Sequence, residues 1–172
     1  MNGFILMLPL FFIRFVLLGW LNPTTLKRGA HFAPMAGAQK IMYVLYQMTN
    51  VVLILFPLFL RVHGSAPLLV LGGVTYVLGA GILLAATISF AKPNEQGLNT
   101  TGSYRFSRNP MYVGYFVYFL GCAILLGSFF YYGALVLFQI ATHWVILAEE
   151  RWCSATFGET YDEYQQQVRR YL

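Results

Sequence analysis

Five apolar runs fill most of this chain, and they restrict its fold more than any other feature. They are Gly3–Trp20, Ile41–Leu60, Pro67–Phe90, Met111–Phe130 and Tyr132–Ala148. A helix needs about 20 apolar residues to cross a bilayer, and each run approaches that length. Only 10% of the residues are charged, against about 25% in a soluble domain. The sequence therefore predicts an all-α polytopic membrane protein with about five transmembrane helices, in a single domain covering residues 1–172.

The polar residues within the runs are few. They include Arg14, Gln47, Asn50, Gln139 and His143, too few to line a path across the membrane, which disfavours a transporter or channel subunit. Arg14 lies about two turns from the cytoplasmic end of its run, and we expect its side chain to snorkel to the headgroups. The first run lacks the basic leader and cleavage site of a signal peptide, so we expect it to stay in the mature protein.

Lysines and arginines gather in alternate connections between the runs. The first connection carries Lys27, Arg28 and Lys40, the third carries Lys92, Arg105 and Arg108, and the C-terminal tail carries Arg151, Arg169 and Arg170. Cytoplasmic segments of membrane proteins carry such an excess, which predicts an N-terminus outside and a cytoplasmic tail. Because these charges border apolar runs, the net charge of +5 indicates contact with anionic lipid rather than nucleic acid.

A polar segment with two arginines separates the third and fourth runs. From Gly102 to Tyr112 it reads Gly-Ser-Tyr-Arg-Phe-Ser-Arg-Asn-Pro-Met-Tyr. Asn109 and Pro110 are typical of a helix start, with the amide side chain capping free N–H groups. A helix start behind Arg105 and Arg108 could also hold a carboxylate or phosphate. Aromatic side chains that could stack on a purine, or form an interfacial belt, are Tyr104, Phe106, Tyr112 and Tyr115.

Two adjacent carboxylates, Glu149 and Glu150, follow the fifth run. The negative end of the helix dipole and partial desolvation disfavour carboxylates there, so we expect a cationic partner, either a ligand or a structural ion pair with Arg151. Phe157 and Gly158 then predict a helix stop. Beyond them, residues at near-helical spacing predict an amphipathic surface helix on the inner leaflet, namely Tyr161, Tyr164, Val168 and Tyr171.

These features suit one class of ligand, an amphoteric metabolite that carries a purine. S-adenosyl-L-methionine combines a carboxylate, an ammonium, a sulfonium and an adenine. The chain also resembles the integral-membrane methyltransferases typified by isoprenylcysteine carboxyl methyltransferase, with phospholipid N-methyltransferases as relatives. The resemblance covers about residues 89–170 and rests on Gly102–Gly114, on the pair Glu149 and Glu150, and on the segment from Phe157 to Tyr164.

The resemblance implies an enzyme that transfers a methyl group from S-adenosyl-L-methionine to a lipophilic acceptor at the cytoplasmic face. With Arg108 added from the basic segment, the expected cofactor contacts are Gln96, Leu98, Asn99, Tyr104, Arg108, Asn109, Pro110, Met111, Tyr112, Glu149 and Glu150. The carboxyl methyltransferases usually have histidine at the position of Asn109 and an arginine at that of Val145, so Val145 is expected to face the substrate. A missing arginine leaves the acceptor open between a carboxylate and a phospholipid amine.

Methyl transfer from a sulfonium is a direct displacement that needs alignment and exclusion of water. No metal is required. A carboxylate acceptor is already ionised, whereas an amine must first lose a proton, which His143 or Glu150 could accept. A membrane protein that binds the cofactor without catalysis is the further alternative.

Overall fold

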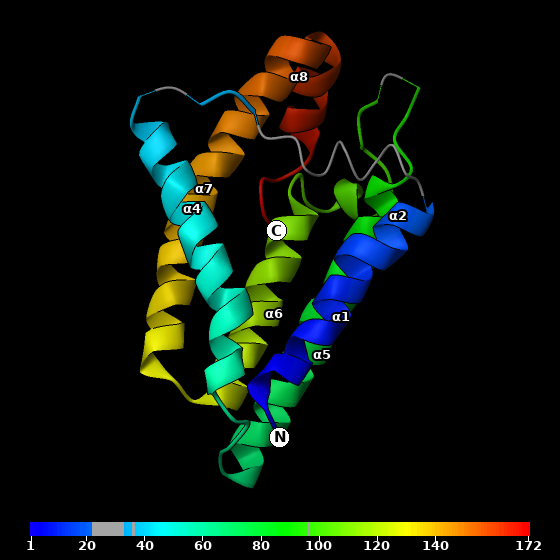
Figure 1. The fold of residues 1–172 in the computed structure, drawn as a ribbon. Helices are drawn as coiled ribbons and strands as arrows, with labels where there is room; N and C mark the ends of the chain where they lie inside the picture. Colours follow the sequence, from blue (N-terminus) through cyan, green and yellow to red (C-terminus); the bar gives the residue numbers. More distant parts are fainter. Residues whose placement is uncertain (22–32, 36, 96) are drawn as a thin grey trace.

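The computed structural model describes residues 1–21, 33–35, 37–95 and 97–172, and these form a helical bundle (Figure 1). The first rod, Gly3–Leu21, joins the 3-10 turn η1 (Gly3–Met7), α1 (Leu8–Phe11), the π-helical turn η2 (Phe12–Leu17) and α2 (Leu18–Leu21). The other elements are α4 (Ala38–Leu55), η3 (Phe56–Phe59), α5 (Ala66–Phe90), η4 (Gly102–Arg105), α6 (Pro110–Leu126), α7 (Phe129–Phe157) and α8 (Glu159–Gln167). Within the described ranges, the β pairing is one isolated bridge between Asn2 and Arg61.

Four of these rods are long and apolar enough to cross a membrane: Gly3–Leu21, Gln39–Phe59, Ala66–Phe90 and Phe129–Phe157. The fifth, α6, is apolar but shorter, with 17 residues. Large apolar side chains on the outside of the bundle are more than half exposed, as at Val70, Val74 and Val77 of α5. The predicted all-α polytopic membrane fold is therefore confirmed.

Two helix boundaries differ from the apolar runs. The fourth run was expected to reach Phe130, but α6 ends at Leu126 because Gly127 adopts a left-handed conformation with φ of 60°. Ser128 then caps α7 by accepting a hydrogen bond from the backbone N–H of Tyr131. At its other end α7 continues past Ala148 to Phe157, so the carboxylate pair lies inside the helix rather than at its end. The predicted stop at Gly158, where φ is 55°, is confirmed.

Figure 1 shows α4 beside α7 and α5 beside the first rod, with α6 between the two pairs. Glycines allow α5 and α6 to approach closely. A Cβ atom at Gly79 would overlap the backbone of Tyr118, and one at Gly121 would overlap the backbone of Tyr76. Such small residues are the usual means by which membrane helices pack backbone to backbone.

We expect Gly79→Ala to destabilise the bundle, because its methyl group would push the backbones of α5 and α6 apart. Gly81→Ala on the same helix is the matched control, since a Cβ there meets no atom within 4 Å. Alanine is also the better helix former, by about 1 kcal/mol. Thermal unfolding in detergent should show a melting temperature several degrees lower for the first variant and unchanged or slightly higher for the second. Equal melting temperatures would contradict the close packing.

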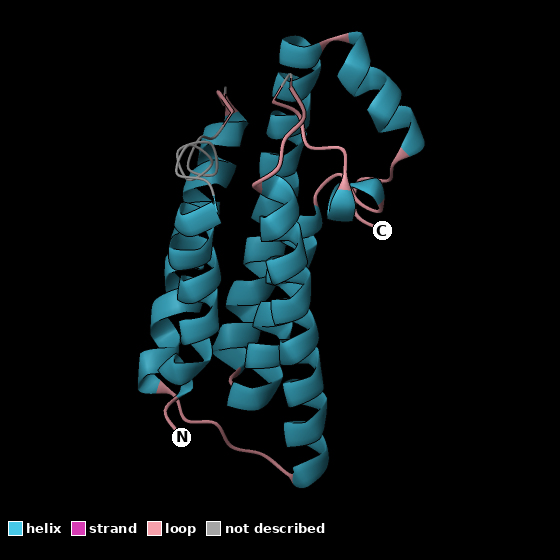
Figure 2. Ribbon diagram, turned by 90° about the vertical axis from the view of Figure 1, so that its right-hand side faces the viewer, coloured by secondary structure: helices cyan, strands magenta, loops and turns pink. Residues whose placement is uncertain are grey.

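The C-terminal amphipathic helix is confirmed as α8, which folds back with the tail at the end of the bundle opposite the N-terminus (Figure 2). It differs from the prediction in two respects. Its tyrosines do not face the inner leaflet, because Tyr161 and Tyr164 are buried against Leu98. The helix also ends at Gln167, so Val168 and Tyr171 belong to the tail that follows it.

Candidate active site

A cavity of about 300 Å3 lies where the spanning helices meet α8 and the loop that precedes α6. This volume is at the lower end of the range for small-molecule sites. Nine of the eleven expected cofactor contacts line it: Leu98, Asn99, Tyr104, Arg108, Asn109, Met111, Tyr112, Glu149 and Glu150. Pro110 occupies the start of α6 and does not line the cavity, and Gln96 lies outside the described residues.

Glu149 presents its carboxylate to the cavity from α7. The hydroxyl of Tyr112 donates a hydrogen bond of 2.9 Å to Glu149 Oε1. The ring of Tyr46 from α4 meets the ring of Tyr112 edge to face, with centroids 6.4 Å apart. Tyr115 completes this aromatic wall. The wall leaves the carboxylate in largely apolar surroundings, with the charge of Arg14 nearby, and a ligand cation would bind it strongly there.

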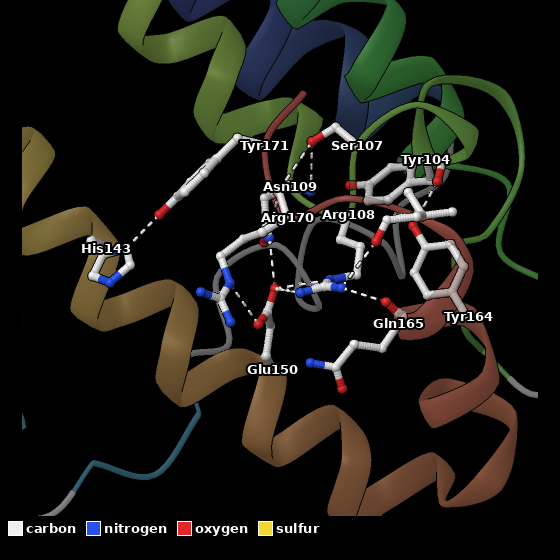
Figure 3. Close-up of polar contacts among 11 residues, drawn as sticks. Tyr104, Ser107, Arg108, Asn109, His143, Glu150, Tyr164, Gln165, Arg170 and Tyr171 are labelled. Atoms are coloured by element: carbon white, nitrogen blue, oxygen red, sulfur yellow. Dashed lines mark hydrogen bonds and ion pairs between the residues drawn. The ribbon is translucent and has the colours of Figure 1, made fainter.

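Glu150 has a different environment, because two arginines and an amide occupy its carboxylate (Figure 3). The Nε and Nη2 atoms of Arg108 each lie 3.1 Å from Oε1, and Asn109 Nδ2 donates to the same oxygen at 3.1 Å. Arg170 Nε donates to Oε2 at 2.9 Å. Glu150 is only 6% exposed. Among the described residues, the cationic partners of this carboxylate are therefore Arg108 and Arg170, and the alternative of a structural ion pair with Arg151 is wrong for Glu150.

Arg108 also fixes the end of α8. Its Nη1 donates to the carbonyl oxygens of Gln165 at 2.7 Å and Val168 at 2.9 Å, which suits a cation at a helix C-terminus. Its backbone N–H donates to Arg169 O at 2.9 Å. The segment before α6 thereby holds α8 and the tail over the cavity.

Asn109 begins α6 as predicted, with Pro110 in the first turn, but its side chain does not cap the helix. The amide instead donates to Glu150 and, at 3.2 Å, to the carbonyl oxygen of Arg170. The expected capping role of Asn109 is therefore wrong. Consequently, the first-turn N–H groups of α6 receive no side-chain cap from Asn109.

His143 and Val145 lie away from the cavity. The ring of His143 contacts the hydroxyl of Tyr171, with 2.6 Å between Nδ1 and the oxygen. Val145 is fully buried in the main apolar core. Neither lines the cavity, although Met111 and Tyr112 pack against the apolar core that contains Val145. Of the four aromatic side chains proposed for stacking, Phe106 is also remote, being 78% exposed, whereas the other three line the cavity.

Comparison with known proteins identifies the family. The sequence profile of the phospholipid methyltransferase family matches residues 62–160, more than half of the chain. The chain belongs to this family. It is also 32% identical over 91 residues to the protein-S-isoprenylcysteine O-methyltransferase of Schizosaccharomyces pombe, and that match covers 52% of this chain and 38% of the relative. The chain thus spans well under half of the relative's length. No solved structure matches it.

The sequence analysis of this phospholipid methyltransferase family member did not predict several of the side chains that line the cavity. Those from α7 and α8 are Trp152, Cys153, Phe157, Tyr161 and Tyr164, and those from the first rod and α4 are Arg14 and Tyr46. The α7 group could have been found, because positions three, four and eight residues after Glu149 share its helical face. Tyr46 carries no such signal.

The placement of Arg14 corrects the expectation that it snorkels to the headgroups. Its side chain lines the cavity, and its Nη1 lies 3.3 Å from Sδ of Met111 in the first turn of α6. An ionisable residue inside an apolar run is itself a signal of function. That signal was present in the sequence.

The α8 side of the cavity is aromatic and closed by hydrogen bonds. The hydroxyl of Tyr164 donates to the carbonyl oxygen of Tyr104 at 2.6 Å. Burial raises the pKa of the Tyr161 and Tyr164 hydroxyls, so both stay neutral at physiological pH. Asn99 is 9% exposed, and its Oδ1 has no hydrogen-bond partner among the described residues. A buried acceptor without a donor is costly, and a ligand that supplies one would remove that cost.

Proposed function

We propose that this chain is an S-adenosyl-L-methionine-dependent methyltransferase that methylates a lipid at the cytoplasmic membrane face. The observation that carries the proposal is the cavity, which places an acidic group, an aromatic wall and the unsatisfied Oδ1 of Asn99 at one end of a membrane bundle. Membership of the phospholipid methyltransferase family supports the same conclusion.

The residues present fit the cofactor. Glu149 would hold its ammonium, and Asn99 Oδ1 would accept a hydrogen bond from the adenine amino group. The aromatic side chains under α8 would stack on the purine, and the uncapped first turn of α6 would donate to the carboxylate. When bound, S-adenosyl-L-methionine would supply a sulfonium methyl group, to which the acceptor bonds as the carbon–sulfur bond breaks and the thioether S-adenosylhomocysteine leaves.

The chain itself contributes alignment and exclusion of water. Arg108 and Asn109 hold α8 and the tail over the cavity through Glu150 and the tail carbonyls. Because two arginines occupy Glu150 and His143 lies away from the cavity, neither expected proton acceptor is well placed. This favours a carboxylate acceptor, which needs no base, as in isoprenylcysteine O-methylation.

A second candidate is N-methylation of a phospholipid amine of the phosphatidylethanolamine type, which the family description favours. To separate the two, purified protein is incubated with methyl-labelled cofactor and either N-acetyl-S-farnesylcysteine or phosphatidylethanolamine. We expect a base-labile methyl ester on the farnesylcysteine. Label in the phospholipid headgroup would support the second candidate. Cofactor binding without transfer to any lipid would overturn the enzymatic function in favour of a binding protein.

We propose further that the cavity and the C-terminus are cytoplasmic and the N-terminus is outside. Ser65 and Glu95 are exposed residues just before and just after α5, so they should lie on opposite sides of the membrane. In a background without Cys122 and Cys153, an impermeant thiol reagent applied to intact cells should label Ser65→Cys and not Glu95→Cys. The reverse pattern would contradict the orientation.

A further inference from the structure

Arg14 brings a positive charge into the cavity from the first spanning rod. It lines the cavity together with Tyr46, Tyr115 and Glu149, and it touches the sulfur of Met111. Its neighbours on the rod point the other way, since the side chains of Phe12, Phe15 and Val16 are 56%, 59% and 58% exposed. The rod therefore turns apolar side chains toward lipid and its guanidinium toward the cavity.

The local backbone conformation indicates that the position of Arg14 has a functional role. Arg14 lies within η2, the π-helical turn Phe12–Leu17. Such turns are rare and occur often at functional sites. Arg14 also lies about 10 Å along the helix from Leu21, at a rise of about 1.5 Å per residue. An arginine at such depth is costly in a membrane protein, and such residues commonly mark a binding or transport path.

We propose that Arg14 binds the anionic group of the lipid acceptor, either a carboxylate whose own oxygen is methylated or a phosphodiester next to a methylated amine. This inference rests on the proposed function. A guanidinium offers paired donors that fit either anion, and aromatic surroundings strengthen the attraction by excluding water. Arg14 and Tyr46 come from spanning helices, whereas most expected cofactor contacts come from the α6 start and its preceding loop. The Arg14 end of the cavity therefore suits a ligand that arrives from the bilayer.

The test measures binding, so it does not require turnover. Protein in a non-ionic maltoside detergent, which carries no phosphodiester, is titrated with N-acetyl-S-farnesylcysteine and with its neutral carboxamide, and tryptophan fluorescence is followed because Trp152 lines the cavity. Short-chain phosphatidylethanolamine and diacylglycerol form the second matched pair. The variants are Arg14→Gln and Arg14→Lys. The control is Arg61→Gln, which changes an exposed arginine that pairs with Asn2 beside the N-terminus.

In one of the two pairs, wild-type protein and Arg61→Gln should bind the lipid that carries the anionic group about 10-fold more tightly than the lipid that lacks it, as for hydrogen bonds to charged groups. Arg14→Gln should lose that preference without a fall in its affinity for S-adenosyl-L-methionine, because the charge of Arg14 acts on Glu149 and repels an ammonium held there. Arg14→Lys should recover part of the preference. A preference within the farnesylcysteine pair would identify the anionic group bound by Arg14 as a carboxylate. A preference within the phospholipid pair would identify it as a phosphodiester.

Three results would overturn the inference. These are a wild type without preference in either pair, an Arg14→Gln variant that keeps the preference, and an Arg14→Gln variant that instead binds the cofactor more weakly. The last result would assign Arg14 to the cofactor carboxylate. An intact preference in a protein that transfers no methyl group would overturn the proposed function and leave the assignment of Arg14 standing.

Discussion

Replacing Glu149 with glutamine is expected to weaken the binding of S-adenosyl-L-methionine by about 10-fold to 150-fold. Hydrogen bonds to charged groups contribute about 1.5–3 kcal/mol, and this carboxylate faces a cavity walled by Tyr46, Tyr112 and Tyr115. Glutamine keeps the size of the side chain and an oxygen that can accept from the Tyr112 hydroxyl. The variant should therefore fold normally and lose mainly the charge that attracts the ammonium. Isothermal titration calorimetry in detergent measures the effect.

The matched control is Glu95→Gln, which removes the same charge from an exposed position in the loop after α5. Its cofactor affinity should equal that of the wild type. Tyr112→Phe separates charge from geometry, because it keeps the carboxylate of Glu149 and removes the hydrogen bond that orients it. We expect a smaller loss of about 5-fold to 10-fold there. Unchanged affinity in Glu149→Gln would exclude the ammonium-clamp role.

The sequence predicted the helices well, because burial in lipid requires long apolar runs and a closed backbone hydrogen-bond pattern. It predicted the end of α7 less well. The apolar run ends at Ala148, yet the residues from Glu149 to Phe157 contain no glycine or proline, so nothing interrupts the helix before Gly158. Hydropathy marks where a helix leaves lipid, and backbone chemistry marks where it ends. The two limits differ here by more than two turns.

The sequence predicted the candidate-site residues that lie close together in the chain. It did not predict the residues that only the packing of distant helices brings to the cavity. Most of the expected cofactor contacts lie in two short segments, around Asn109 and around Glu149, and α6 and α7 bring them to one cavity. Tyr46 reaches the cavity only because α4 packs along α7, which no local pattern reveals. The pairing of Glu150 was missed for the same reason, since its partner Arg170 is 20 residues away.

Removing the carboxylate of Glu150 is expected to lower the free energy of unfolding by about 3–5 kcal/mol, the usual effect of breaking a buried ion pair from one side. In Glu150→Gln, the guanidinium of Arg108, whose side chain is 8% exposed, would lose its counter-charge without gaining access to water. Chemical denaturation in detergent without cofactor measures the change. The control, Arg151→Gln, removes an exposed charge from the adjacent position and should alter stability by less than about 0.5 kcal/mol.

The loss of stability on replacing a partner of Glu150 should increase with the burial of that partner and with the number of hydrogen bonds that it makes. The free energy of unfolding should fall in Arg108→Gln by nearly as much as in Glu150→Gln, because Arg108 also donates to the carbonyl oxygens of Gln165 and Val168. Arg170→Gln should have a smaller effect, since its side chain is 33% exposed and water can replace part of the interaction. If Glu150 served only as a catalytic base, Glu150→Gln would unfold like the wild type and lose only turnover. Such a result would contradict the structural role, because a buried carboxylate that holds α6, α7 and the tail together must affect folding before it affects chemistry.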